Sequence, residues 1–221
     1  MSKLVTIYGG SGFVGRYIAR RMAKEGWRVR VAVRRPNEAI FVRPYGVPGQ
    51  VEPVQCNITD DASTRAAMDG ADAVVNCVGI LAEGGRNQFD AVHEEGAARI
   101  AKLAAELGIP RMVHISSIGA DSAADSLYSQ TKGRGEAVVL EAMPNALILR
   151  PSIVFGQEDQ FFNRFAGMTK MGPAIPLVGT GTRFQPVFVD YVSQAAVMVI
   201  LGQAKGTFEL GGPETASFRA L

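Results

Sequence analysis

Residues 4–15 read Leu-Val-Thr-Ile-Tyr-Gly-Gly-Ser-Gly-Phe-Val-Gly, and this stretch decides the fold of the chain. It joins a short apolar run to four glycines, at positions 9, 10, 12 and 15, and a helix-like segment, 16–25, follows. The spacing fits both G-x-G-x-x-G and G-x-x-G-x-x-G, whose glycines permit a tight turn, let backbone approach phosphates and let helix pack closely on strand. Free N–H groups at the start of that helix then face an anion. The stretch predicts a site for the pyrophosphate of a dinucleotide, with a purely structural strand-to-helix turn as the alternative.

The length is that of one large domain, or of one domain plus a small appendage. The chain has 221 residues, a net charge of +2 and interspersed acids and bases, so nothing points to a nucleic-acid partner. Cys56 and Cys77 each end a strand-like run, which is typical of buried, reduced thiols in a cytosolic protein. The longest apolar stretches, 73–81 and 195–201, are too short to span a bilayer, and the N-terminus has no signal-peptide pattern. We expect a cytoplasmic protein with no transmembrane segment and no metal site.

Strand-like and helix-like segments alternate along residues 1–150, which predicts an α/β fold with a doubly wound parallel sheet (a Rossmann fold) that binds NAD(P). The Pro- and Gly-rich residues 36–49 are expected to form a loop, and Thr59 or Asp60 is expected to cap a helix. The expected strands are 4–8, 28–33, 51–55, 73–77, 112–116 and 146–149, and the expected helices are 16–25, 62–68, 88–107 and 133–142.

After Pro151 the alternation weakens, and residues 151–221 are expected to form a short substrate-side segment packed on the same domain. The pattern predicts helices at 161–171 and 192–201, a loop at 172–182 and strands at 186–189 and 207–210. Residues 211–218 have the pattern of a turn leading into a helix cap, but the chain ends at Leu221, which leaves no room for a helix. We therefore expect the substrate-side portion to be incomplete.

The pair Tyr128 and Lys132 is the main candidate for catalysis. At i and i+4 on a helix, the two side chains share one face. A phenol has an ordinary pKa of about 10, and a neighbouring ammonium is expected to favour the phenolate and bring it toward neutral pH. Ser117, at the end of the fifth expected strand, has a hydroxyl that could hold a substrate carbonyl or alcohol. An exposed helical pair without a catalytic role is the alternative.

Over nearly its whole length the chain resembles the extended or atypical short-chain dehydrogenases/reductases of the NAD-dependent epimerase/dehydratase superfamily. Within that superfamily it is most similar to the nucleotide-binding accessory subunit of respiratory complex I and its bacterial relatives. The superfamily features are Gly9-x-x-Gly12-x-x-Gly15, Asn76-Cys77-Val78-Gly79, Ser116-Ser117, Tyr128-x-x-x-Lys132 and Arg150–Gly156. The subfamily features are Gly12-Phe13-Val14-Gly15-Arg16, Val92–Ala97 and Gln185–Asp190.

The resemblance implies a set of cofactor-binding residues. Asn57 stands where family members usually have Asp, so the contact with adenine would be neutral, and His93 stands where many carry Asn, which suggests a packing role. His114, inside a strand, is expected in the core. The implied cofactor-binding residues are Gly9, Gly10, Ser11, Gly12, Phe13, Val14, Gly15, Asn57, Ile58, Val78, Gly79, Ser116, Tyr128, Lys132, Pro151, Ser152 and Ile153.

The end of the second expected strand indicates which nicotinamide nucleotide binds. An NAD site usually has an acidic residue there, for the ribose hydroxyls. This chain has Arg34 and Arg35 instead, with no acid before Glu38, and Arg16 is available nearby. Guanidinium groups suit a 2′-phosphate, so we expect NADP(H) to be favoured over NAD(H). Two solvated loop arginines are the alternative.

Three functions remain open. The subfamily resemblance favours an NADP(H)-binding accessory module that supports respiratory NADH-quinone oxidoreductase. The set Ser117, Tyr128 and Lys132 favours an active NADP-dependent reductase or epimerase, and a redox-sensing nucleotide-binding regulator is the third. The Phe- and Met-rich residues 161–171 suit a hydrophobic partner, a membrane edge or a quinone-like substrate, and equally a lid over the substrate. The location would then be cytoplasmic or peripheral at the inner membrane.

Overall fold

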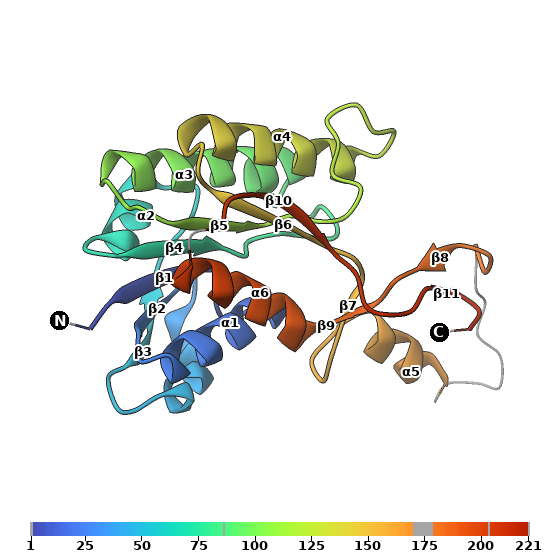
Figure 1. Ribbon diagram of the computed structural model, residues 1–221, viewed down its shortest axis with the longest axis horizontal. Helices are drawn as coiled ribbons and strands as arrows, with labels where there is room; N and C mark the ends of the chain where they lie inside the picture. The colour runs from blue at the N-terminus through green and yellow to red at the C-terminus, as the bar shows by residue number, and fades with distance from the viewer. Residues whose placement is uncertain (1, 86, 170–178, 203, 221) are drawn as a thin grey trace.

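A parallel sheet of seven strands forms the centre of the molecule, in the order β10-β6-β5-β4-β1-β2-β3 (Figure 1). The computed structural model describes residues 2–85, 87–169, 179–202 and 204–220. The α/β doubly wound fold is as predicted, and strand order reverses between β1 and β4, where α/β proteins bind ligands. The strands are β1 (Leu4–Tyr8), β2 (Arg28–Val33), β3 (Val51–Gln55), β4 (Ala73–Asn76), β5 (Met112–Ile115), β6 (Leu147–Pro151) and β10 (Gly206–Leu210).

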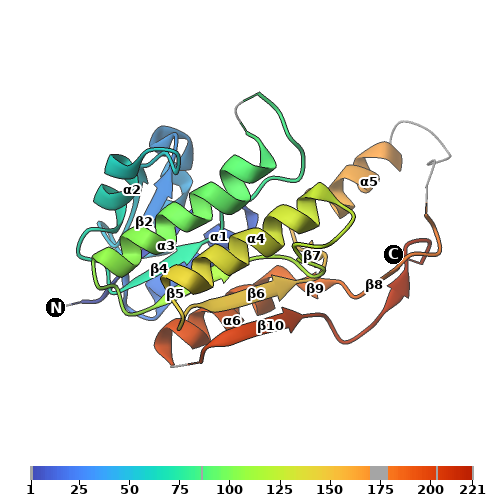
Figure 2. The same ribbon diagram turned by 90° about the horizontal axis from the view of Figure 1, so that it is seen from above.

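Helices cover both faces of this sheet (Figures 1 and 2). The helices are α1 (Phe13–Lys24), α2 (Asp61–Met68), α3 (Gly96–Glu106), α4 (Leu127–Ala142), α5 (Phe162–Thr169) and α6 (Val189–Leu201). Alternate residues of β1 point to opposite layers: Ile7 packs in the core shared with α1 and α6, whereas Tyr8 packs in the core shared with α2 and α3. The Tyr8 hydroxyl donates a hydrogen bond to the Thr64 carbonyl at 2.7 Å, which ties α2 to the sheet.

The two helices that follow β3 and β5 begin where side chains cap them. The Asp60 carboxylate accepts a hydrogen bond from the Ser63 N–H at 2.8 Å, so Asp60 is the cap of α2, one of the two residues predicted for it. The Ser126 hydroxyl accepts one from the Ser129 N–H at 3.1 Å and caps α4. Helix α4 therefore begins one residue before Tyr128, and this places Tyr128 and Lys132 one turn apart on one helix as expected.

Two segments differ from the expected elements for identifiable reasons. The prediction of a loop at 36–49 was wrong, because Pro36–Tyr45 forms a 3-10 helix, η1. Its buried side chains, Ala39 and Val42, are three residues apart and so lie on one face of a helix with three residues per turn. The long helix expected at 88–107 is interrupted, because Asp90–Glu95 forms a π-helical segment, η2, before α3. Such insertions are frequent at functional sites.

Residues beyond Pro151 build a small lobe and also return to the sheet (Figure 1). Helix α6 packs beside α1, and β10 pairs with β6 in parallel. The lobe contains α5, two-residue strands and four phenylalanine rings, Phe161, Phe165, Phe184 and Phe218, whose neighbouring centroids lie 5.2 to 6.3 Å apart. Its strands are β7 (Val154–Phe155), β8 (Arg183–Phe184), β9 (Val187–Phe188) and β11 (Ala216–Ser217).

This lobe corrects two expectations about the end of the chain. Phe161 and Phe165 are half-buried against the other rings, so they form a small core and not an exposed patch. Residues 211–218 do not lead into a helix cap, because β11 pairs with β8 in antiparallel fashion. Residues 170–178, which include Met171 and most of the expected 172–182 loop, lie outside the described residues. Among the described residues, no helix has both the length and the apolar character needed to cross a bilayer.

Candidate functional site

The loop between β1 and α1 is packed so closely that side chains are excluded from it. Gly9 has a φ of +71°, and a Cβ there would lie 3.1 Å from the backbone carbonyl of Cys77 at the end of β4. A Cβ on Gly15 would collide with the Gly9 carbonyl oxygen and lie 2.7 Å from the Gly10 Cα. The Gly12 N–H donates to the Gly9 carbonyl at 2.9 Å, which closes the turn. The predicted roles of the glycines as turn and close-packing residues therefore agree with the geometry.

The start of α1 fits an anion. Gly12 is the N-cap, and within the described chain no side chain caps this helix and no acid lies in its first turn. The N–H groups at the helix start, from Phe13 to Gly15, carry the positive end of the helix dipole and need acceptors. Phe13 and Val14 are half-buried and Ser11 is partly exposed beside them. A pyrophosphate supplies the missing acceptors, so the residues present fit a dinucleotide.

The segments after β4 and β3 flank this loop. The Asn76 side chain accepts a hydrogen bond from the Val78 N–H at 3.0 Å and so turns the chain toward Gly79. Asn57 is exposed after β3, where its carbonyl accepts from the Ser63 hydroxyl at 3.2 Å. Ile58 packs toward α3, since a Cβ on Gly96 would lie 2.6 Å from its Cδ1 atom. These residues lie on both sides of the strand-order reversal, where the two halves of a dinucleotide would bind.

The arginines expected to select the nucleotide lie at the end of β2. The Gly9 N–H donates to the Ala32 carbonyl at 3.0 Å, which brings the end of β2 against the glycine loop. Exposed Arg34 donates to the Asn87 side chain at 3.0 Å. Arg35 pairs with Glu38 at 3.1 Å and is mostly solvated. Arg16 donates to the Ser11 carbonyl at 3.0 Å, so it lies along the glycine loop. Arg16 thus lies along the loop and Arg34 contacts Asn87 just beyond the end of β2, whereas Arg35 points to solvent with its partner.

The candidate catalytic side chains meet at the carboxyl end of β5. Lys132 is only 5% exposed, and its Nζ donates to the Ile115 carbonyl at a long 3.4 Å. A Cβ on Gly79 would lie 3.3 Å from the same Nζ, so Lys132 faces the segment after β4. Among the described residues, the hydroxyls of Ser116 and Ser117 are buried without a hydrogen-bond partner. Unpartnered buried hydroxyls cost folding free energy, which is typical of groups that wait for a ligand.

Burial shifts the pKa values of this set. It lowers the pKa of Lys132 to about 8, although Glu136 and Cys77 act in the opposite direction. Burial raises the pKa of Tyr128, and the neighbouring Ser117 hydroxyl opposes that rise without forming a hydrogen bond of normal geometry. We expected Lys132 to lower the phenol pKa, but in the chain alone desolvation outweighs any such effect. The phenol is therefore protonated at neutral pH, and the pKa of Lys132, about 8, lies close to neutral pH.

The family segment at the end of β6 completes the edge. The Ile118 N–H donates to the Pro151 carbonyl at 3.0 Å, which holds the Ser117 segment against β6. The Ser152 N–H donates to the Leu210 carbonyl at 2.8 Å, and the Ile153 carbonyl accepts from the Val187 N–H at 2.9 Å. Pro151, Ser152 and Ile153 thus link the catalytic edge to β10 and to the small lobe.

His93 has a larger part in this site than the sequence indicated. Its Nε2 accepts from the Ile80 N–H at 3.1 Å, and its Nδ1 donates to the Thr131 hydroxyl at 3.0 Å, because that hydroxyl itself donates to the Tyr128 carbonyl. The ring lies edge-on to Tyr128 at 5.4 Å and stacks on Phe89 at 5.3 Å. Burial lowers the pKa of His93 to about 4, so the ring is neutral at pH 7. His93 thereby ties the segment after β4 to the helix that carries Tyr128.

The sequence signal for this part of the site was His93 itself, which the resemblance places where many extended members of the superfamily carry Asn. His114 behaves as expected of a core residue: it is 1% exposed, and its Nδ1 lies 3.1 Å from the Asn76 amide nitrogen. Burial lowers the pKa of His114 to about 3.

A surface hollow of about 770 Å³ lies elsewhere, between α2, α3 and α4, and charged side chains such as Lys102 and Glu106 line it.

The comparisons with known proteins agree with this geometry. Residues 5–211 match the NAD dependent epimerase/dehydratase family. The chain belongs to this family. Its fold is similar to that of the Bordetella bronchiseptica enzyme WbmG in complex with NAD: the TM-score is 0.80 at 17% identity, over 100% of this chain and 76% of that one. A putative epimerase from Burkholderia cenocepacia gives a TM-score of 0.81 at 22% identity, over 99% and 78%.

Relatives in this family include subunits of respiratory complex I, as the resemblance predicted. The mitochondrial NADH dehydrogenase (ubiquinone) 1 alpha subcomplex subunit 9 of Arabidopsis thaliana is 35% identical over 99% of this chain and 56% of its own length. The 40 kDa subunit of NADH-ubiquinone oxidoreductase of Neurospora crassa is 32% identical, over 95% and 56%. A ceramide reductase of Caulobacter vibrioides is 30% identical, over 94% and 64%. The chain thus spans little more than half the length of these complex I subunits.

Proposed function

We propose that this chain binds NADP(H) and uses Ser117, Tyr128 and Lys132 to interconvert a carbonyl compound and an alcohol. The observation that carries the proposal is the burial of the Lys132 amine at the same sheet edge as the glycine loop. Burying a cation on one long hydrogen bond is unfavourable for folding, and such groups with shifted pKa values gather at functional sites. The glycine loop and the start of α1 would hold the pyrophosphate, and NADP(H), when bound, supplies or accepts the hydride.

Each catalytic side chain has a role that its surroundings support. Tyr128, protonated at neutral pH, would donate its proton to the carbonyl oxygen, and Ser117 would donate a hydrogen bond to the same oxygen. Lys132, with a pKa of about 8, would then donate a proton from its ammonium group to the Tyr128 phenolate. His93 would hold Tyr128 in place through its edge-on ring contact and through Thr131. His93 is therefore a positioning residue.

The preference for NADP(H) rests on Arg34 and Arg16. Arg16 lies along the glycine loop, Arg34 directly follows β2, and the end of β2 has no acid for the ribose hydroxyls. Two structural neighbours were solved in complex with NAD, but those proteins share under 25% of their residues with this one. Arg34 would exchange its bond with Asn87 for a bidentate contact with a 2′-phosphate.

The test is turnover of NADPH with a panel of quinones, aldehydes and sugar nucleotides, with Tyr128→Phe as the comparison. Loss of the proton donor is expected to lower kcat about 10²- to 10⁴-fold while the affinity for NADPH changes little. Tyr191→Phe is the matched control, because Tyr191 lies on α6 with a side chain that is 61% exposed. If no substrate is turned over faster by the natural protein than by Tyr128→Phe, the catalytic proposal is wrong.

A second candidate is an accessory module of a respiratory complex, and the identity with complex I subunits favours it. In that case the nucleotide is held for structural reasons, in the cytoplasm or peripherally at the inner membrane. Co-purification with the respiratory complex after mild detergent extraction, with NADP(H) retained and not exchanged, is the expected result. Recovery in the free fraction with rapid nucleotide exchange would contradict this candidate. Retention without any complex would instead favour the redox-sensing regulator.

A further inference from the structure

Three large apolar side chains are exposed on the segments that form the candidate active site. Leu81 is 79% exposed, Ile118 is 47% exposed and Leu127 is 45% exposed. We call these three residues the apolar rim. They come from three different segments: the one after β4, the one after β5 and the first residue of α4. Exposed apolar side chains of this size are costly in water when they gather, and gathered ones mark ligand-binding surfaces.

Each residue of the rim is next in sequence to a residue that meets at the Tyr128 ring. Leu127 directly precedes Tyr128, and Ile118 directly follows Ser117, whose hydroxyl neighbours the phenol. Leu81 follows Ile80, whose N–H donates to His93, and the His93 ring contacts Tyr128. The three rim residues therefore belong to the segments that bring Ser117, His93 and Tyr128 together.

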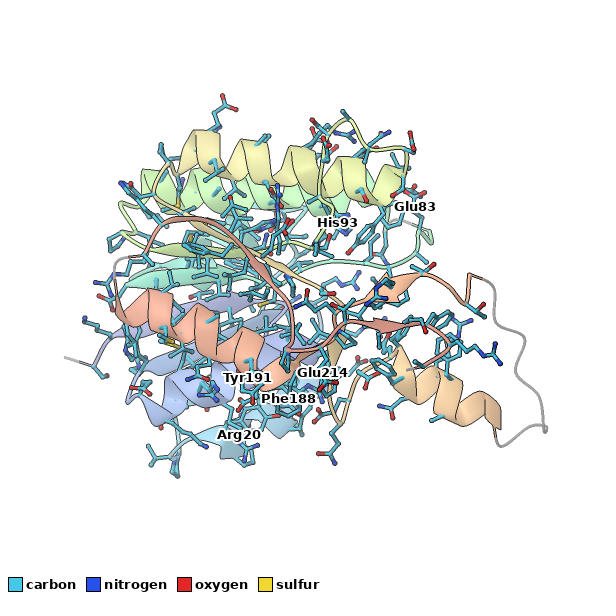
Figure 3. The ribbon with its side chains drawn as sticks, turned by 45° about the vertical axis from the view of Figure 1, so that its right-hand side comes forward. Arg20, Glu83, His93, Phe188, Tyr191 and Glu214 are labelled. Atoms are coloured by element: carbon cyan, nitrogen blue, oxygen red, sulfur yellow. The ribbon has the colours of Figure 1, made fainter. Side chains whose placement is uncertain are left out.

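The two segments that carry the rim contain acidic but no basic residues, while the Lys132 amine faces Gly79 from α4. Residues 79–85 and 116–127 contain Glu83, Asp121 and Asp125 and no Lys or Arg. Glu83 is held in place by the Phe89 N–H at 2.9 Å, and Phe89 stacks on His93, so this carboxylate stays near the site (Figure 3). The Asp121 carboxylate accepts from the Ala123 N–H at 2.8 Å. Fixed carboxylates disfavour a substrate that carries a diphosphate.

We propose that the site takes an uncharged carbonyl compound, or the matching secondary alcohol, that bears a hydrocarbon chain. The polar end lies at Tyr128 and Ser117, and the chain lies against the apolar rim. This inference rests on the proposed function, since it assigns the substrate class of that same site. A mostly apolar wall with a few placed polar groups is the usual composition of a small-molecule site.

The test is calorimetric binding of 2-butanol, 2-hexanol and 2-octanol, with and without NADPH, and of UDP-glucose as the charged probe. Each buried methylene is expected to strengthen binding about three- to fourfold, so 2-octanol should bind on the order of 100-fold more tightly than 2-butanol. Leu127→Ser and Leu81→Ser should each reduce the affinity for 2-octanol at least about threefold. Leu201→Ser on α6 is the matched control, because Leu201 is 44% exposed, and it should leave the affinity unchanged.

Affinity that does not depend on chain length, or UDP-glucose binding more tightly than 2-octanol, overturns the inference. NADPH is titrated separately in the same instrument. If NADPH binds and the alcohol series is flat, the inference is wrong and the nucleotide-binding part of the proposed function stands. If NADPH does not bind, the proposed function is wrong, while the alcohol series measured without nucleotide still decides whether the apolar rim binds hydrocarbon chains.

Discussion

The glycine loop between β1 and α1 and the cluster of Ser117, Tyr128 and Lys132, called here the Lys132 centre, lie at the same sheet edge. The two regions are built in opposite ways. In the loop, Gly9 and Gly15 leave no room for a Cβ, and backbone N–H groups make the site. At the Lys132 centre, polar side chains are buried, and desolvation lowers the pKa of the amine to about 8. The first region follows from local sequence and backbone geometry, and the second depends on what the whole fold packs around one amine. The two regions should therefore respond differently to substitution.

The largest effect should come from the loop. Gly15→Ala places a Cβ against backbone atoms that cannot move away, so the turn must open and the N–H groups lose their alignment. We expect the affinity for NADPH to fall at least about 100-fold, or about 2.7 kcal/mol, and the unfolding free energy to fall by about 1–3 kcal/mol. Calorimetry and thermal unfolding measure both.

The matched control for this substitution is Gly167→Ala in α5, where a Cβ meets nothing within 4 Å. A helical glycine in open space should gain up to about 1 kcal/mol when it is replaced by alanine, with no change in nucleotide affinity. Unchanged binding in Gly15→Ala would show that the loop is only a strand-to-helix turn.

The Lys132 centre should respond in the opposite sense. Lys132→Met removes a buried cation, so we expect the unfolding free energy without nucleotide to rise at pH 7 by an amount on the order of 1–3 kcal/mol, while catalysis is lost. Because the folded pKa, about 8, lies below the ordinary value of 10.5, the unfolded chain binds more protons between these two values. The stability of the natural protein, relative to the variant, should therefore increase as the pH rises from 8 to 10.5.

Urea unfolding of both proteins at pH 7, 9 and 10 measures this difference. Lys102→Met, at an exposed position on α3, is the control and should show no such pH-dependent difference. A variant that is less stable than the natural protein at pH 7 would mean that Lys132 supports the fold and is not held there at a cost.

The smallest effect should distinguish the two coenzymes. Arg34→Gln removes the guanidinium that directly follows β2, so the affinity for NADPH should fall about tenfold, near 1.4 kcal/mol, while the affinity for NADH stays the same. Arg35→Gln is the control, because Arg35 is paired with Glu38 in solvent. Fluorescence titration measures both coenzymes. Equal losses for NADPH and NADH would show that Arg34 does not read the 2′-phosphate.

The regions of the molecule also differ in how far sequence could predict them. The seven parallel strands were expected within two residues, because buried strands alternating with helices leave a clear periodic pattern. The Asp60 cap was predictable because it depends on residues three apart. Segment 36–49 was not, because its helix buries only Ala39 and Val42 and has Pro44 inside it. Residues 211–218 were misassigned because their partner strand, β8, lies about thirty residues earlier.

By itself, the sequence determined the strand–helix alternation, the close-packed glycine loop and the shared helical face of Tyr128 and Lys132, since each depends on residues near one another in the chain. Only the tertiary structure decided that Lys132 is buried against Gly79, and that the pKa of Tyr128 is raised and not lowered. It also decided that His93 links Ile80 to Thr131. The physical reason is that desolvation and contacts between distant segments depend on the packed whole, which no local pattern records.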